Sequence, residues 1–143
     1  MILKIQPVDV NYISQIWHLV EQYLVDSLTE GAEKQNIDPG YNIHHVQGFL
    51  ASGQWLLLVA VDEDNKIHGA MSVSFINYPT ARVAFISLTG GKLVLNKETF
   101  EQLKEILRQR GATKVQAHGR KSMVRLLERT GFKSQTTLLE ADL

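Results

Sequence analysis

The C-terminal segment Gly111–Leu143 constrains the fold of this 143-residue chain more than any other part, because three elements follow one another in it. Lys114–His118 is a short β-rich run, which predicts a strand. Lys121–Thr130 places apolar residues at helical spacing, and Gly131 can end that helix because glycine enters the left-handed region without steric cost. The extended run Ser134–Ala141 follows and predicts a further strand. The segment therefore indicates a strand–helix–strand unit that closes an α/β domain.

The preceding residues predict seven more elements. Asp9 or Asn11 can cap the first helix, and its apolar positions recur to Leu28. The nearly continuous apolar run Trp55–Val61 is typical of a strand that is covered on both faces. The expected elements are strands at Leu3–Gln6, Trp55–Val61, Ile67–Ile76 and Arg82–Leu88, helices from Asp9 or Asn11 to Leu28, over Asn42–Ala51 and over Asn96–Arg110, and a loop at Thr29–Gly40.

The element order β-α-α-β-β-β-α-β-α-β predicts one α/β domain over residues 1–143. Adjacent strands in the middle of the chain form an antiparallel meander, and helical crossovers at the end cover the sheet. We expect a central mixed, largely antiparallel twisted sheet with helices on both faces.

Composition excludes several functions. Lys plus Arg and Asp plus Glu number 15 each, so no whole-protein field favours nucleic acid. Cysteine is absent, which rules out disulfides, thiolate metal sites and a cysteine nucleophile. No carboxylate–histidine set has metal-ligand spacing, so we predict no metal. We see neither a signal peptide nor a run that could span a bilayer, and we expect a cytoplasmic protein without membrane partners.

The element order and the Gly131-Phe132 turn resemble the GNAT (N-acetyltransferase-like) superfamily across almost the whole chain. The resemblance implies that the strands Arg82–Leu88 and Lys114–His118 run parallel and then splay, with acyl-CoA in the splay. It also implies that the loop entering the helix near Lys97 donates amides to the pyrophosphate, since a helix N-terminus attracts anions.

The sequence departs from that family at the phosphate loop. The family motif is Gln/Arg-x-x-Gly-x-Gly/Ala, whereas residues 88–96 read Leu-Thr-Gly-Gly-Lys-Leu-Val-Leu-Asn. The glycines can let the backbone approach a phosphate, but we favour a strand end with a short extended connection. The candidate cofactor-binding residues are Thr89, Gly90, Gly91, Lys92 and Arg120.

A second departure lies in the last helix. Family members often carry Asn-x-x-Ala-x-x-x-Tyr-x-x-x-Gly-Phe, with Asn on the pantetheine arm and Tyr as proton donor to the thiolate. Here Arg120, Met123 and Leu127 stand at the Asn, Ala and Tyr positions. Leu127 cannot donate a proton, so the usual general acid is absent.

Three residues are candidates for catalysis. His118 follows the last-but-one strand where the splay opens, and histidine titrates in a range suited to a general base. His44 lies with His45 on the second helix, on the acceptor side in the family arrangement. Tyr78 can line the mouth of the cleft. The alternatives are a strand-end histidine, surface histidines and a tyrosine placed by turn chemistry.

The last helix also carries a basic face, formed by Lys121, Arg125 and Arg129 with Arg120 and Lys133 nearby. This face suits a CoA phosphate, an acidic protein or nucleic acid. It carries no interleaved aromatic residues on which bases would stack, so nucleic-acid binding is the minor alternative.

Scattered motifs narrow the resemblance to GNAT-like proteins of tailed bacteriophages and prophages. They are Gly90-Gly91, Tyr78-Pro79, Gly119-Arg120 and the ending Glu140–Leu143. This implies a virion-associated or accessory protein-interaction module with a degenerate acyl-CoA site and no bound cofactor, whose partners are phage head or tail components or a second copy. The alternative is a divergent N-acetyltransferase that uses acetyl-CoA.

Overall fold

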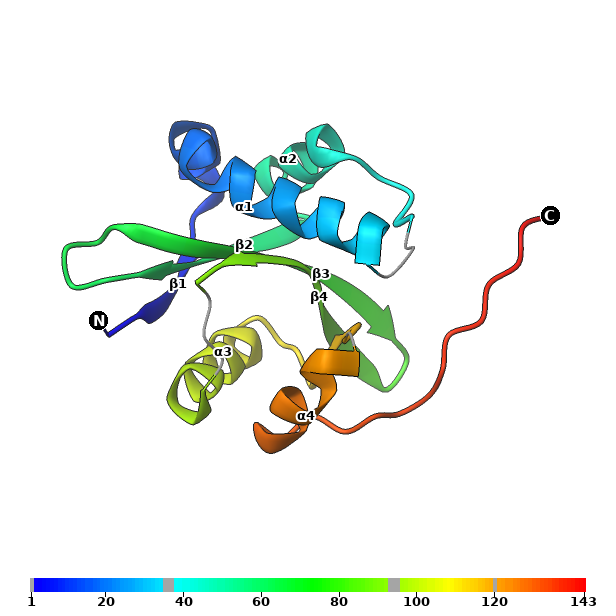
Figure 1. The fold of residues 1–143 in the computed structure, drawn as a ribbon. Helices are drawn as coiled ribbons and strands as arrows, with labels where there is room; N and C mark the ends of the chain where they lie inside the picture. Colours follow the sequence, from blue (N-terminus) through cyan, green and yellow to red (C-terminus); the bar gives the residue numbers. More distant parts are fainter. Residues whose placement is uncertain (1, 35–37, 93–95, 120) are drawn as a thin grey trace.

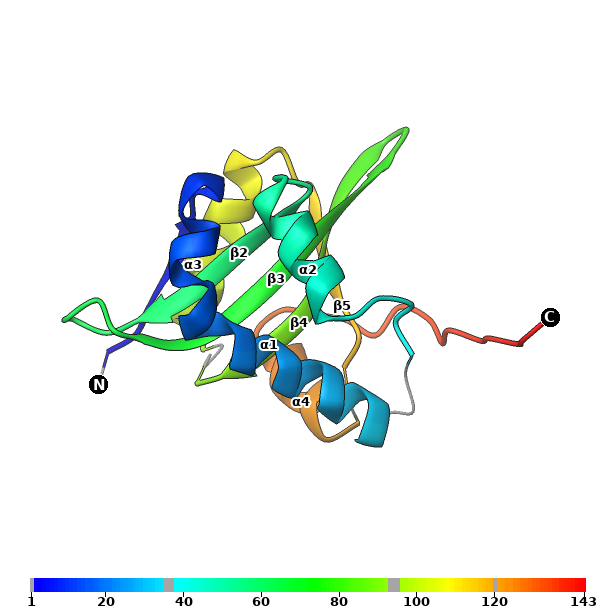
Figure 2. The same cartoon turned by 90° about the horizontal axis from the view of Figure 1, so that it is seen from above.

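The computed structural model describes residues 2–34, 38–92, 96–119 and 121–143. Its centre is a five-stranded sheet in the order β1-β2-β3-β4-β5 (Figure 2). The strands are β1 (Lys4–Val8), β2 (Trp55–Val61), β3 (Ile67–Tyr78), β4 (Ala81–Gly91) and β5 (Lys114–Ala117). Neighbours pair antiparallel except β4 and β5, which are parallel. The predicted mixed, largely antiparallel sheet is confirmed.

Helices cover both faces of the sheet, as predicted (Figure 1). The helices are α1 (Ile13–Lys34), α2 (Ile43–Ala51), α3 (Lys97–Gln109) and α4 (Lys121–Arg129), and a 3-10 turn over Val10–Tyr12 precedes α1. The first two helices lie on one face, and α3 and α4 lie on the other. Each face has its own apolar core. One is built around Val20, Leu24 and Leu57, and the other around Leu58, Met71 and Leu103.

Asparagine caps start two of the helices where the sequence predicts them. The Asn42 side chain accepts from the amides of His44 and His45, and Asn96 accepts from the amide of Thr99. These bonds satisfy donors that a helix N-terminus otherwise leaves unpaired.

Two predicted boundaries near the N-terminus are wrong. The first helix continues to Lys34, so Gly31 is helical and the expected loop is shorter. A Lys34–Glu30 ion pair of 3.4 Å, one turn apart, supports this extra turn. Pro7 does not end the first strand but lies within it, which is possible because β1 is an edge strand.

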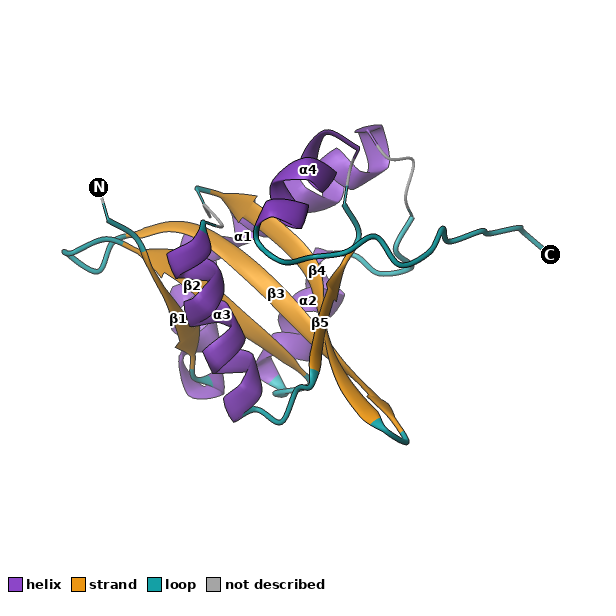
Figure 3. Cartoon of the chain, turned by 90° about the horizontal axis from the view of Figure 1, so that it is seen from below, coloured by secondary structure: helices purple, strands orange, loops and turns teal. Residues whose placement is uncertain are grey.

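The largest correction concerns the C-terminus, because the predicted strand Ser134–Ala141 does not form. Residues 133–143 are irregular and exposed, and they lead away from the body of the molecule (Figures 1 and 3). A strand needs a neighbour that satisfies its amides and carbonyls, and none of the described strands pairs with this segment. The sheet therefore has five strands instead of six.

Within the described residues, none of the helices has the length and apolar character needed to cross a membrane.

Candidate functional site

The parallel pairing of β4 and β5 ends where the resemblance places the acyl-CoA site, and the region beyond this end is called the splay. Pairing of β4 with β5 begins at Val83 and Lys114 and stops at Ile86 and Ala117, although β4 continues to Gly91. The last residues of β4 therefore have β3 on one side only. A splay of this kind leaves strand edge open to a ligand.

A β-bulge at Ser87 marks the start of the splay. On β3, Val73 pairs with Ile86 while Ser72 pairs with Leu88, so Ser87 is the extra residue. Its hydroxyl lies 2.8 Å from the Ser72 hydroxyl and donates to the Ser72 carbonyl at 3.0 Å. The bulge also reverses the faces, because Ile86 belongs to the core under α3 and Leu88 to the core under α1. Bulges bend strands and re-aim side chains.

The two adjacent glycines let α1 approach β4, which leaves no phosphate cradle on that side. A Cβ on Gly90 would lie 2.0 Å from the Tyr23 carbonyl oxygen, and one on Gly91 would lie 2.5 Å from the His68 carbonyl oxygen. The residues end β4, and both pair with β3. β4 thus ends at these glycines, and the expected extended connection falls on residues 93–95, outside the described part of the chain.

Thr89 precedes the two glycines on β4 and contacts both α1 and the opposite face of the sheet through different groups. Its amide donates to the Ser27 hydroxyl of α1 at 3.1 Å. Strand alternation points its side chain away from α1, toward the face that α3 and α4 cover, because Leu88 and Gly90 face α1. The Thr89 hydroxyl oxygen is buried and has no hydrogen-bond partner among the described residues. A buried orphan hydroxyl beside an open strand edge fits a polar group of a ligand.

The rest of the predicted phosphate loop is described only at its ends. The Lys92 amide donates to the His68 carbonyl at 2.8 Å, and the Lys92 side chain is exposed. Leu93–Leu95 and Arg120 lie outside the described residues. At the start of α3, the Thr99 amide donates to the Asn96 side-chain oxygen and the Phe100 amide donates to the Asn96 carbonyl.

His118 and Leu127 lie near the β5 side of the splay. His118 is exposed directly after β5, and its ring meets the edge of Phe85 with 5.0 Å between centroids. The Leu127 side chain would lie 3.3 Å from a Cβ on Gly119, the residue after His118. An apolar side chain thus occupies the region where the resemblance implies a proton donor.

The other two catalytic candidates lie elsewhere. Tyr78 is 55% exposed at the tip of the β3–β4 hairpin, at the opposite end of β4 from the splay. His44 is exposed on the first turn of α2, and the neighbouring His45 accepts the Asn42 amide through Nδ1. The three candidates therefore lie on different elements, and their catalytic roles stay predictions. They are His118 after β5, His44 on α2 and Tyr78 at the end of β3.

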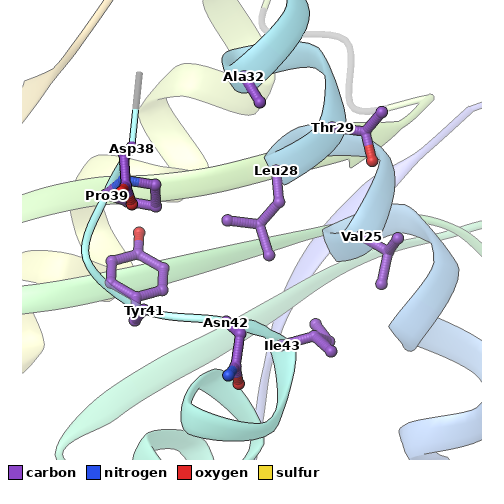
Figure 4. A pocket seen from close by; sticks show the side chains of 9 residues that line it. All are labelled: Val25, Leu28, Thr29, Ala32, Asp38, Pro39, Tyr41, Asn42 and Ile43. Atoms are coloured by element: carbon purple, nitrogen blue, oxygen red, sulfur yellow. The ribbon is translucent and has the colours of Figure 1, made fainter. Parts of the chain in front are cut away.

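A shallow, largely apolar pocket of about 320 Å³ lies between α1 and the segment that leads into α2 (Figure 4). Val25 and Leu28 line it from α1, and Pro39 and Tyr41 line it from the other side. The ring of Tyr41 stands edge-on to Trp55 at 5.1 Å. Burial raises the pKa of the Tyr41 phenol, so this side chain is a neutral hydrogen-bond donor at neutral pH.

The same part of α1 also contacts the end of β4. Ser27, between Val25 and Leu28 in the sequence, accepts the hydrogen bond from the Thr89 amide.

The sequence analysis missed a histidine–carboxylate pair at the β2–β3 turn, because nothing in the spacing of Asp62 and His68 distinguishes it. His68 Nε2 lies 2.7 Å from Asp62 Oδ2, and Asp62 Oδ1 accepts from the amides of Asp64 and Lys66. The hydrogen bond to His68, followed by that to the Lys66 amide, lowers the pKa of Asp62.

This pair predicts a pH-dependent contribution to stability. Because the folded-state pKa of Asp62 is lowered, the contribution is present above the ordinary pKa of aspartate and is lost as pH falls through the folded value. We expect Asp62→Asn to be less stable than the wild type at neutral pH and the difference to shrink in acid. Urea denaturation of both proteins at several pH values measures it, and a pH-independent difference would contradict the prediction.

The basic face of the last helix is exposed where it is described. Arg125, Arg129 and Lys133 are all exposed. Among the described residues, no group of three or more His, Cys, Asp or Glu side chains has the arrangement of a metal site.

The fold is that of the GNAT acetyltransferases. With a TM-score of 0.66 and 17% identity, the chain is similar to the soil-metagenome aminoglycoside acetyltransferase meta-AAC0020 in complex with sisomicin, covering 99% of this chain and 96% of that one. A predicted acetyltransferase of Clostridium acetobutylicum with acetyl-CoA gives 0.63 and 17% over the same shares. BH1408 of Bacillus halodurans gives 0.68 and 17% over both full chains.

No protein-family sequence model matches the chain, and the comparison with curated protein sequences found no match. At such low identities, the structural likeness establishes the fold alone.

Proposed function

We propose that the protein is a divergent N-acyltransferase that uses acetyl-CoA and binds it in the splay between β4 and β5. The observation that carries the proposal is the end of the parallel ladder at Ile86 and Ala117, next to the Ser87 bulge, while β4 continues to Gly91. The acetyltransferases with the same fold, one of them holding acetyl-CoA, support this choice.

The residues present fit an acyl-CoA in part. The buried hydroxyl of Thr89, which has no hydrogen-bond partner in the described part of the chain, can bond the arm of the ligand, and the exposed Lys92 can pair with a phosphate. The first amides of α3 add a weak positive potential. Gly90 and Gly91 do not contribute a cradle, because α1 and β3 fill the space beside them.

The chain would act mainly by positioning. A bound acyl-CoA supplies an activated thioester; the acyl carbon–sulfur bond breaks as a carbon–nitrogen bond to the acceptor amine forms. His118, on the β5 side of the splay, takes the proton that the amine loses. The Leu127 side chain cannot donate a proton, so the leaving thiolate is protonated by water. Holding the two reactants together can still supply much of the rate enhancement.

The acceptor amine would enter through the pocket between α1 and α2. Its apolar walls, Val25, Leu28 and Pro39, suit the carbon skeleton of an amine. The neutral phenol of Tyr41 and the carboxylate of Asp38 in the lining suit its polar end.

Calorimetric titration with acetyl-CoA tests the proposal. We expect saturable binding to the wild type and its loss in Ala117→Phe, which places a ring where the strands part. Ala81→Phe, at the far end of β4, is the matched control and should bind normally. Circular dichroism verifies that both variants fold. The absence of binding to the wild type at about 1 mM acetyl-CoA, a level that already corresponds to only about 4 kcal/mol, would refute the proposal.

A thiol-release assay with a panel of primary amines then tests transfer itself. Sisomicin belongs in the panel because it is bound in a structure of the same fold. We expect thiol release that depends on both amine and acetyl-CoA and that falls in His118→Ala with binding unchanged. Binding without any amine-dependent release would restrict the proposal to an acyl-CoA-binding protein.

A second candidate function is a protein-interaction module, favoured by the exposed C-terminal segment. Leu138 and Leu139 are 74% and 87% exposed there, whereas leucine is among the residues most often buried in folded proteins. A phage or virion role stays a prediction without support from the comparisons.

A further inference from the structure

We propose that the C-terminal tail, residues 134–143, adds a sixth strand to the open edge of β5 in a second copy of this chain. The inference does not depend on acyl transfer. It starts from two features of the described residues: a tail that none of the described strands pairs with, and a sheet edge at β5 with no described strand beyond it.

The tail exposes apolar surface that its own chain leaves uncovered. Residues 134–143 are exposed throughout, and Leu138, Leu139 and Leu143 are among the most exposed large apolar side chains. Phe132 anchors the start of the tail by stacking on Phe100, with 5.0 Å between ring centroids. Beyond this anchor the tail runs outward, away from the body (Figures 1 and 3).

The edge of β5 is the complementary feature. β5 pairs with β4 on one side and is the last strand in the sheet order. Its outer amides and carbonyls therefore form a template for an added strand. Its residues alternate, because Val115 and Ala117 pack toward the α3 core whereas Lys114 and Gln116 are exposed.

The tail has the matching alternation. Leu139, Ala141 and Leu143 would share one face of an extended strand, and Leu138 would lie with the acidic Glu140 and Asp142 on the other. Placed beside β5, the apolar face continues the side of Val115 and Ala117. The acidic face continues the side of Lys114.

Charge fixes the direction of pairing. The acidic end of the tail lies near Lys114 and Arg110, at the start of β5, only if the tail runs antiparallel to β5. Neither Arg110 nor Lys114 is in an ion pair among the described residues. Cross-strand pairs of opposite charge favour one register over others. Arg82 takes no part, because its guanidinium already donates to Asn77 and to the Arg110 carbonyl.

Light scattering after size-exclusion chromatography tests the assembly. We expect a mass twice the 16.1 kDa of one chain, and a single-chain mass after removal of residues 134–143. The double variant Glu140→Lys, Asp142→Lys should dissociate, and adding Arg110→Glu and Lys114→Glu should restore the dimer. Glu63→Lys with Asp64→Lys, the same charge change at the β2–β3 turn, should leave the dimer intact. A single-chain mass for the wild type would overturn the proposal.

Cysteine cross-linking shows which chain donates the strand. Because the sequence contains no cysteine, no native thiol competes in the reaction. The register that sets Glu140 opposite Lys114 also sets Leu138 opposite Gln116, within reach of a disulfide. Gln116→Cys and Leu138→Cys proteins, carrying tags of different size, are mixed and oxidised. A mixed covalent dimer is expected, whereas Gln15→Cys on α1 in place of Gln116→Cys should give none. If a chain carrying both cysteines links only within itself, the tail closes its own sheet and the second-copy proposal fails.

Discussion

Gly90→Ala is expected to destabilise the fold by about 3 kcal/mol, the upper end of the usual cost of overpacking. The added methyl group would lie 2.0 Å from the Tyr23 carbonyl oxygen and 2.6 Å from its carbonyl carbon. Because these are backbone atoms of α1, no side-chain rotation relieves the clash, and α1 or the end of β4 must move. Urea denaturation monitored by circular dichroism measures the loss.

Gly48→Ala is the matched control. Gly48 lies in α2, and a Cβ there meets no heavy atom within 4 Å. Alanine favours a helix over glycine by about 1 kcal/mol, so this variant should be slightly more stable than the wild type. Equal stability of the Gly90→Ala and wild-type proteins would show that α1 does not pack against β4 in this way.

Leu103→Ala is expected to cost about 3 kcal/mol of the free energy of unfolding, since truncation of a buried leucine loses apolar contacts and leaves a cavity. Leu103 is fully buried on α3 in the core that also contains Leu58 and Met71. A loss of this size is a large fraction of the stability of a small domain.

Leu19→Ala provides the control for this second prediction. Leu19 lies on α1 and is 50% exposed, so the same change of side chain should cost well under 1 kcal/mol. Thermal unfolding of both variants, verified by denaturant titration, measures the contrast. Similar losses for the two leucines would mean that α3 is not docked on the sheet.

The sequence predicted the elements that rest on local patterns. The apolar run Trp55–Val61 is the buried strand β2, with the predicted bounds, and α2 and α3 begin within one residue of their predicted starts. These features depend on side chains close in sequence, so periodicity and capping identify them.

The candidate site depended more on packing than on pattern. From the sequence, Gly90 and Gly91 could approach a phosphate, although a strand end is favoured. Their space is filled by β3 and by α1, a helix that ends more than fifty residues earlier. The Ser87 bulge, which opens the splay, leaves no signature in a run of alternating residues.

The sequence by itself determined the α/β class and the order of the helices and first five strands, because these follow from residue type and spacing. It also placed Leu127 where the resemblance implies a proton donor. Only the tertiary structure decided where the pairing of β4 with β5 ends, which glycines serve helix packing, and that none of the described strands of the same chain pairs with the segment after Phe132. A strand exists through its neighbour, and the strand-forming pattern of residues 134–143 cannot tell which edge, or which chain, supplies one.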